Sequence, residues 1–312
     1  MRLKIVGSAA GGGFPQWNCN YYLSRAARAG VVGVWPRTQS SLAASADGHG
    51  WVLFNASPDI RQQIAATPEL QPHGVENLRN TPIRAVVLTN ADVDHIAGLL
   101  SLRERQPFAV YATGRVLATL RANSIFNVLD PAFVPRRQLH EGVEMDIEDA
   151  EGRATGVQVE AFAVPGKVAL YLEDPNRPTE NYGSESGDAI AVRISGAPGE
   201  TAAFYIPGCA RIDPGLRQRL SGAACVFFDG TLYTDDEMVA AGVGPKTGQR
   251  MGHLAMSGVD GSISRLADVS IGRRIFVHIN NTNPVLDESS PEHEAVRAAG
   301  WEIGHDGMEI RL

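Results

Sequence analysis

Four residues that could bind a metal or move protons lie within a six-residue segment: Asn90, Asp92, Asp94 and His95. Carboxylates this close repel one another unless a cation holds them, and the imidazole is a further metal ligand. Aspartate is also common at helix N-caps, so Asp94 as a capping residue is the alternative interpretation. The segment alone leaves both interpretations open.

The elements around this segment place it at the end of a strand. Residues 85–88 are a short apolar run that predicts a buried strand, and apolar residues after His95 recur at helical spacing. A second strand, 274–278, ends in His278 and leads into polar residues 279–284. Ligands of α/β sheets gather at the carboxyl ends of strands, so His278 is expected beside Asp94 and His95.

Three other segments contain candidate functional residues. The glycine-rich segment 247–258 includes His253, a candidate proton shuttle or substrate contact, although an exposed polar loop fits equally well. Asp229 follows an apolar strand, but Gly230 comes next, and an Asp-Gly turn is the favoured interpretation. The loop 7–15 lacks the Lys-Ser/Thr ending of a phosphate-binding loop, and we expect it to line a site.

Strands alternate with helices in both halves, which predicts an α/β fold with mixed sheets in a single domain, 1–312. Ser57 and Pro58 predict a helix start, and residues 173–188 predict a long surface loop. Strands are expected at 3–6, 41–45, 51–54, 85–88, 108–111, 143–148, 157–164, 189–194, 201–206, 225–228 and 274–279, and helices at 58–66, 95–104, 114–122, 215–220, 235–241, 261–267 and 291–299.

Composition argues against several classes of function. The 312 residues are 44% hydrophobic and 20% charged, as in globular proteins. A net charge of -7 argues against a nucleic-acid partner, because duplex affinity depends on neutralising phosphates. No apolar stretch is long enough to predict a membrane span, and residues 1–7 lack the apolar segment of a signal peptide. Three widely spaced cysteines fit the reducing cytoplasm, where we expect the protein.

Several segments together resemble a known family. Residues 90–95 occupy the frame of the His-x-His-x-Asp-His signature of metallo-β-lactamase-fold proteins. Segments 7–19, 55–60, 92–100, 245–258 and 278–284 resemble the coenzyme PQQ biosynthesis protein B family, over essentially the whole chain. The resemblance implies an αββα metallo-β-lactamase-like sandwich, in which two mixed sheets pack face to face with helices outside and the site at one edge.

The sequence departs from the hydrolases of this fold at the metal ligands. Those enzymes hold two zinc ions, whereas here Asn90 and Asp92 occupy the first two histidine positions. No histidine lies between His140 and His253, and Pro-Gly-Cys follows residues 204–206 where a bridging carboxylate is usual. One metal position is therefore expected to be lost. The remaining ligands are Asp94, His95 and His278, with Asp92 either a further ligand or a residue that orients His95.

Two imidazoles and one carboxylate are the ligand set of non-haem iron oxygenases, although zinc accepts the same ligands. PQQ is built from a Glu and a Tyr of a precursor peptide, and the tyrosine ring must gain oxygen. The resemblance therefore implies hydroxylation of that tyrosine with one Fe(II) and O2. The candidate catalytic residues are His253 and Asp92, and the candidate substrate-binding residues are Asn280, Asn281, Asn283, Lys167 and Arg250.

Two other functions use the same residues. A carrier that binds PQQ or its precursor for transport to the periplasm requires no open metal position. A hydrolase with one zinc requires a metal-activated water. We rank the hydroxylase first and the hydrolase last. The expected partners are the precursor or PQQ and other proteins of the pathway, and a homodimer remains open.

Relatives commonly carry Cys-x-Cys-x-x-Cys near the N-terminus, a set suited to a structural zinc. This chain retains only Cys19 of the three. A single thiolate cannot form such a site, so we expect no structural zinc. We expect Tyr21, Tyr22 and Leu23 to fill the space by packing.

Overall fold

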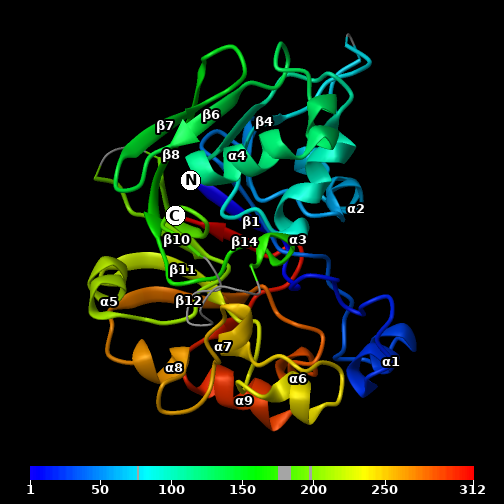
Figure 1. Ribbon diagram of the computed structural model, residues 1–312, viewed down its shortest axis with the longest axis vertical. Coiled ribbons are helices and arrows are strands. Elements are labelled where there is room, and N and C mark those ends of the chain that lie inside the picture. The colour runs from blue at the N-terminus through cyan, green and yellow to red at the C-terminus, as the bar shows by residue number, and fades with distance from the viewer. Residues whose placement is uncertain (76, 175–183, 197–198) are drawn as a thin grey trace.

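Two mixed, seven-stranded sheets form the centre of the computed structural model, which describes residues 1–75, 77–174, 184–196 and 199–312 (Figure 1). The first sheet has the order β14-β1-β2-β3-β4-β5-β6, and the second β13-β12-β11-β10-β9-β8-β7. Strands β3 to β6 run parallel, as do β10 to β13, and the other neighbours are antiparallel. Most of the loop expected at 173–188 lies outside the described residues.

Each sheet comes mainly from one half of the chain, the first sheet from the N-terminal half and the second from the C-terminal half. The first sheet contains β1 (Arg2–Gly7), β2 (Ser41–Ser45), β3 (Trp51–Phe54), β4 (Ile83–Val87), β5 (Ala109–Thr113), β6 (Arg136–Leu139) and β14 (Glu309–Arg311). The second contains β7 (Glu144–Glu148), β8 (Ala154–Ala163), β9 (Ile190–Ser195), β10 (Ala203–Ile206), β11 (Ala223–Asp229), β12 (Ile271–Val277) and β13 (Glu302–Ile303).

The helices are short and lie on the outer faces of the sheets. In Figure 1, α2, α3 and α4 lie in the upper part, and α5 to α9 in the lower part. The α-helices are α1 (Tyr22–Arg28), α2 (Ile60–Ala66), α3 (Val93–Ile96), α4 (Gly114–Ala122), α5 (Pro214–Leu220), α6 (Glu237–Ala240), α7 (Gly248–Met251), α8 (Ser262–Arg265) and α9 (Pro291–Ala298). The 3-10 helices are η1 (Pro68–Leu70), η2 (Ala97–Leu102), η3 (Ser124–Val128), η4 (Leu170–Leu172) and η5 (Pro284–Leu286).

Three hydrophobic cores separate four layers. The central core joins the facing sides of the two sheets, for example Val87 and Tyr111 with Val192 and Phe227. A second core lies between the first sheet and helices that include α2 and α4, and a third between the second sheet and α1, α5 and α9. Because each sheet buries both faces, its central strands are continuous apolar runs. The predicted αββα sandwich is confirmed.

Two helices near the candidate site differ from the predictions made from the sequence. The helix predicted from residue 58 begins at Ile60, because the Ser57 hydroxyl accepts a hydrogen bond from the Asp59 amide in a preceding turn. The helix predicted at 95–104 is instead the short α3 followed by η2. At Gly98 the backbone of η2 approaches residues 56–57 so closely that a Cβ atom would lie 2.1 Å from the Ser57 carbonyl oxygen. Strands β6, β13 and β14 were not predicted, since two to four residues show no clear alternation.

Candidate metal centre

The predicted ligands come from the ends of one strand in each sheet. Strand β4 leads through residues 88–92 into α3, which carries Asp94 and His95. Strand β12 ends at Val277, and His278 follows it. His278 has a left-handed φ of 57°, a conformation that is uncommon without glycine and is concentrated at functional sites. The site therefore lies at the edge where the two sheets meet.

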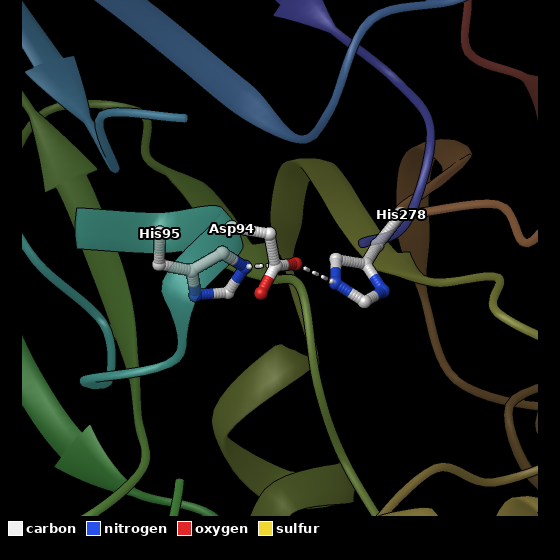
Figure 2. Close-up of side chains that lie close together, drawn as sticks. All are labelled: Asp94, His95 and His278. Atoms are coloured by element: carbon white, nitrogen blue, oxygen red, sulfur yellow. Dashed lines mark hydrogen bonds and ion pairs between the residues drawn. The ribbon is translucent and has the colours of Figure 1, made fainter. Parts of the chain in front are cut away.

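Asp94 lies between the two histidine rings, as Figure 2 shows. Its Oδ2 atom is 3.2 Å from Nε2 of His278 and 3.6 Å from Nε2 of His95. The three potential ligand atoms all lie within 4.8 Å of one another. The structure thus brings together the two imidazoles and the carboxylate that the sequence predicted.

Threonine hydroxyls fix the orientation of both imidazoles. The Thr89 hydroxyl donates to Asn55 Oδ1, so it must accept from Nδ1 of His95, 3.3 Å away. The Thr231 hydroxyl donates to an Asp229 oxygen at 2.7 Å and accepts from Nδ1 of His278 at 2.8 Å. Nδ1 is therefore a donor in both rings. Nε2 of each ring faces Asp94, and Nε2 of His278 lies within hydrogen-bond distance of Asp94 Oδ2, at 3.2 Å.

This arrangement fits a metal ion. Nε2 of His95 is buried and has no hydrogen-bond partner among the described residues. It faces a carboxylate oxygen, so two acceptors point at one another without a proton between them. A divalent cation bound by Asp94, His95 and His278 would satisfy all three groups, and both iron and zinc accept this donor set.

The charges of the three residues are strongly coupled. Burial opposes ionisation of Asp94, but the charge of His95 and the hydrogen bond and charge of His278 outweigh it and lower the pKa of this carboxyl. Burial lowers the pKa of His95, which Asp94 only partly offsets. Burial also acts to lower the pKa of His278, but its hydrogen bond to Asp94 and the nearby carboxylate charges raise it overall. An ionised carboxylate and a neutral His95 are the forms that bind metal.

Asp229, expected from the sequence to form a turn, lies beside the candidate site. Its Oδ2 accepts from the Cys209 amide at 2.9 Å and lies 2.8 Å from Nδ1 of His253, while its Oδ1 accepts from the amide and hydroxyl of Thr231. These four bonds use the acceptor capacity of the carboxylate. Although Asp229, His253 and His278 also form a cluster of potential ligands, Asp229 is better suited to orient His253 than to bind a second metal.

The strand-end rule that located His278 could have identified Asp229. Strands β11 and β12 are parallel neighbours, and Asp229 lies opposite Val277, one residue before His278. His253 then stacks on His278, with ring centroids 5.1 Å apart.

A cavity of about 290 Å³ opens onto the site. Asp92, Lys167 and Asn280 line it, as does Lys246. Asp92 is outside the three-ligand cluster: its Oδ1 accepts from the Leu170 amide at 3.2 Å and is 3.9 Å from the Lys167 ammonium.

Three of the predicted substrate-binding residues do not line this cavity. Arg250 pairs with Glu173 at 2.7 Å. The Asn281 amide donates to Gln16 Oε1. Asn283 is fully buried and accepts from the Val285 amide at the start of η5, which is a structural role.

The N-terminal segment packs only in part as expected. Leu23 is fully buried and Tyr21 packs against the core of the second sheet, but Tyr22 is 44% exposed. Tyr22 therefore does not fill the space as predicted. The Cys19 sulfur accepts a hydrogen bond from the Tyr21 amide.

Comparison with known proteins agrees with this fold. The family model of the beta-lactamase superfamily domain matches residues 50–279, and the chain belongs to that superfamily. It is 54% identical to coenzyme PQQ synthesis protein B of Methylobacterium nodulans and 49% identical to that of Xanthomonas campestris pv. campestris (strain B100), with 100% of each chain covered. The chain therefore belongs to the coenzyme PQQ synthesis protein B family.

Solved structures show the same relationship. The Zn²⁺-bound PqqB from Methylobacterium extorquens matches with a TM-score of 0.94 at 50% identity, covering 100% of both chains. A diphosphatase of the PhnP family matches with a TM-score of 0.66 at 19% identity, over 99% of this chain and 97% of that one, and shows the shared fold alone. Among the described residues, no helix combines the length and the apolar character needed to cross a membrane.

Proposed function

We propose that this protein acts in PQQ biosynthesis as a cytoplasmic, metal-dependent enzyme that hydroxylates the tyrosine ring of a Glu–Tyr precursor, using Fe(II) and O2. Family membership supports the pathway, because the full-length relatives are PQQ synthesis proteins. The observation that carries the metal is the unpartnered, buried Nε2 of His95, which faces Asp94 beside His278. The Zn²⁺-bound relative further supports a metal.

Iron bound by these three residues would supply open positions for O2 and for the substrate. A role for His253 is supported by its position, since its Nδ1 is held by Asp229 and its ring lines the cavity. His253 can then accept or return a substrate proton at Nε2, and Asp229 acts as a positioning residue. Burial opposes ionisation of Asp229. The charge of His253 and its hydrogen bond, with smaller effects of His278 and Thr231, outweigh burial and lower the pKa of this carboxyl, so Asp229 stays ionised.

The cavity also suits an anionic substrate. Lys167 and Lys246 line it, and the precursor unit carries carboxylates. Asp92 lies 3.9 Å from the Lys167 ammonium, so we assign Asp92 the task of positioning Lys167. The alternative role for Asp92 is to contact the metal through a water molecule. An Asp92→Asn variant separates the two roles, because only the alternative role predicts a lower metal affinity.

The experiment that tests the proposal compares the wild type with His278→Ala and Asp229→Asn. Each protein is loaded anaerobically with Fe(II), mixed with a cross-linked Glu–Tyr substrate and exposed to O2, and the product mass is measured. The wild type should add oxygen. His278→Ala should lose iron and activity, whereas Asp229→Asn should keep iron but turn over at least tenfold more slowly with an altered pH profile.

His140→Ala is the matched control, because His140 is exposed and lies outside the cavity. It should behave like the wild type. If no protein adds oxygen and His278→Ala binds PQQ as tightly as the wild type, the enzyme proposal fails and the carrier is favoured. Oxygen-independent hydrolysis of a substrate with zinc would instead favour the hydrolase.

A further inference from the structure

A larger cavity, of about 810 Å³, shares no lining residue with the candidate metal centre. Its walls come from the segment 35–37, Glu288, helix α9, and residues 301–306 around the edge strand β13. Neither the metal nor the proposed substrate accounts for it.

A buried arginine forms part of this cavity. Arg37 is only 8% exposed, and its Nη1 donates to the Gly304 carbonyl and the Ser8 hydroxyl. Its Nε is buried without a hydrogen-bond partner among the described residues, and no carboxylate of those residues forms an ion pair with it. A buried guanidinium that no carboxylate contacts directly is costly, so an added anion would stabilise it.

Three acidic residues line the cavity, and each already has a partner. Glu288 accepts from Nε1 of Trp35 at 3.1 Å. Asp306 accepts from the amide and hydroxyl of both Ser8 and Thr38. Glu302 forms two hydrogen bonds with Arg273, each 2.8 Å long. Burial lowers the pKa of Arg37, and the charges of Asp306 and Glu288 offset this only in part.

The opposite wall can hold an aromatic anion. His293 and Arg297 are four residues apart in α9, so they share the face that lines the cavity. Nδ1 of His293 donates to the Val285 carbonyl at 2.9 Å, which fixes the orientation of this ring in the wall. Trp35 is 49% exposed, and its Nε1 donates to Glu288 at 3.1 Å, so the indole is fixed in position.

We propose that this cavity binds a small aromatic carboxylate, whose carboxylate group pairs with Arg37 and whose ring lies against Trp35. The guanidinium is a fixed cation in the cavity wall, and guanidinium groups pair well with carboxylates. The fixed indole supplies an apolar face at little entropic cost. Arg297 provides a second cation for a ligand with two carboxylates. The inference is independent of the proposed function.

Isophthalate is a suitable probe, because its two carboxylates are too far apart to chelate one metal ion. Isothermal titration calorimetry of metal-free wild type should show saturable 1:1 binding, and the neutral isophthalamide should not bind. Arg37→Gln should weaken binding at least tenfold, and Arg297→Gln severalfold. Arg121→Gln, an exposed arginine of α4 outside this cavity, should bind as the wild type does.

Arg37→Gln removes a buried side chain, so its thermal unfolding is measured in parallel. If that variant does not fold, Arg297→Gln and Trp35→Leu test the proposal instead. Both side chains are exposed, so replacing them should not unfold the protein. The proposal is overturned if the wild type shows no saturable binding, or if folded variants bind isophthalate unchanged. Loss of binding in His278→Ala but not in Arg297→Gln would place the probe at the metal centre and also overturn it.

Discussion

Single hydroxyl groups decide which nitrogen of each histidine faces the metal position. The Thr231 hydroxyl accepts from Nδ1 of His278 and donates to Asp229. The Thr89 hydroxyl likewise accepts from Nδ1 of His95 and donates to Asn55. Such partners of metal-binding histidines fix ring orientation and the site of protonation. Metal binding at this candidate site would therefore depend on residues that are not themselves ligands.

Replacing the Thr231 hydroxyl should weaken metal binding without unfolding the protein. Thr231→Val keeps the shape of the side chain but removes the group that holds Nδ1 of His278. We expect the affinity for Zn²⁺ to fall about 10- to 100-fold, as measured by competition with a chromophoric chelator. Thr119→Val, on α4 away from the site, should leave affinity unchanged. Equal affinities in both variants would show that Thr231 does not orient the ligand.

Glu237 should make folding stability depend on pH. Burial raises the pKa of its carboxyl from 4.5 to about 7, against hydrogen bonds from Thr282 and the Tyr233 amide. The folded state therefore holds a proton more tightly than the unfolded state, and stability falls as pH rises from about 4.5 to about 7. The loss reaches about 3 kcal/mol, because one pKa unit corresponds to about 1.4 kcal/mol.

The Glu237→Gln variant should lose this pH dependence. Both proteins are unfolded with urea at about pH 5, 6, 7 and 8. The free energy of unfolding of the variant should rise relative to that of the wild type as the pH increases. Glu104→Gln, the same change at an exposed glutamate that does not contribute to the pKa of Glu237, is the control. A constant difference between wild type and Glu237→Gln across this range would contradict the assignment.

At the scale of elements, one close backbone contact positions α3. The amide of Gly98 donates to the Ala56 carbonyl, and the Ala56 amide donates to the His95 carbonyl. These bonds tie the start of η2 and the end of α3 to the turn after β3. Any side chain at residue 98 must push that turn away.

Gly98→Ala should therefore destabilise the protein and displace His95. We expect a loss of about 2–4 kcal/mol, as for other overpacked or strained sites, with reduced metal affinity in the folded fraction. Gly114→Ala is the matched control, because a Cβ there meets only the side chain of Gln138, at 3.3 Å. Denaturant unfolding and metal titration measure both effects. If the variant were stable and bound metal normally, the turn at residues 56–57 could move without cost and the prediction would be wrong.

At the scale of the whole molecule, the candidate metal centre lies between the two sheets. Asp94 and His95 follow β4 of the first sheet, and His278 follows β12 of the second. A metal bound by all three residues can bind only when both sheets are in place. Metal binding should then stabilise the folded state as a unit.

Adding Zn²⁺ at about 100 times its Kd should stabilise the wild type by about 2.7 kcal/mol. For a protein of this size, Tm should rise by several degrees, and EDTA should reverse the change. Differential scanning calorimetry of His278→Ala should show no such shift, whereas His140→Ala should retain it. A similar shift in both variants would indicate that zinc binds elsewhere.

The sequence by itself determined the α/β class, the strand-end positions of Asp94, His95 and His278, and the resemblance to the PQQ family. These conclusions rest on local patterns: apolar runs, the residues that follow them, and long shared strings. A strand and the polar group after it are adjacent in the chain, so their relation needs no knowledge of the fold.

Only the tertiary structure decided how residues distant in the sequence work together. Asp229 orients His253 because the register of β11 and β12 places it beside His278, and Asn283 is a structural cap because η5 turns its side chain into the core. The Arg37 cavity likewise requires α9 and β13 to lie beside a segment more than 250 residues earlier in the chain, as the Arg37 contact with Gly304 shows. Such contacts depend on long-range pairing and packing, which no local pattern of residue types encodes.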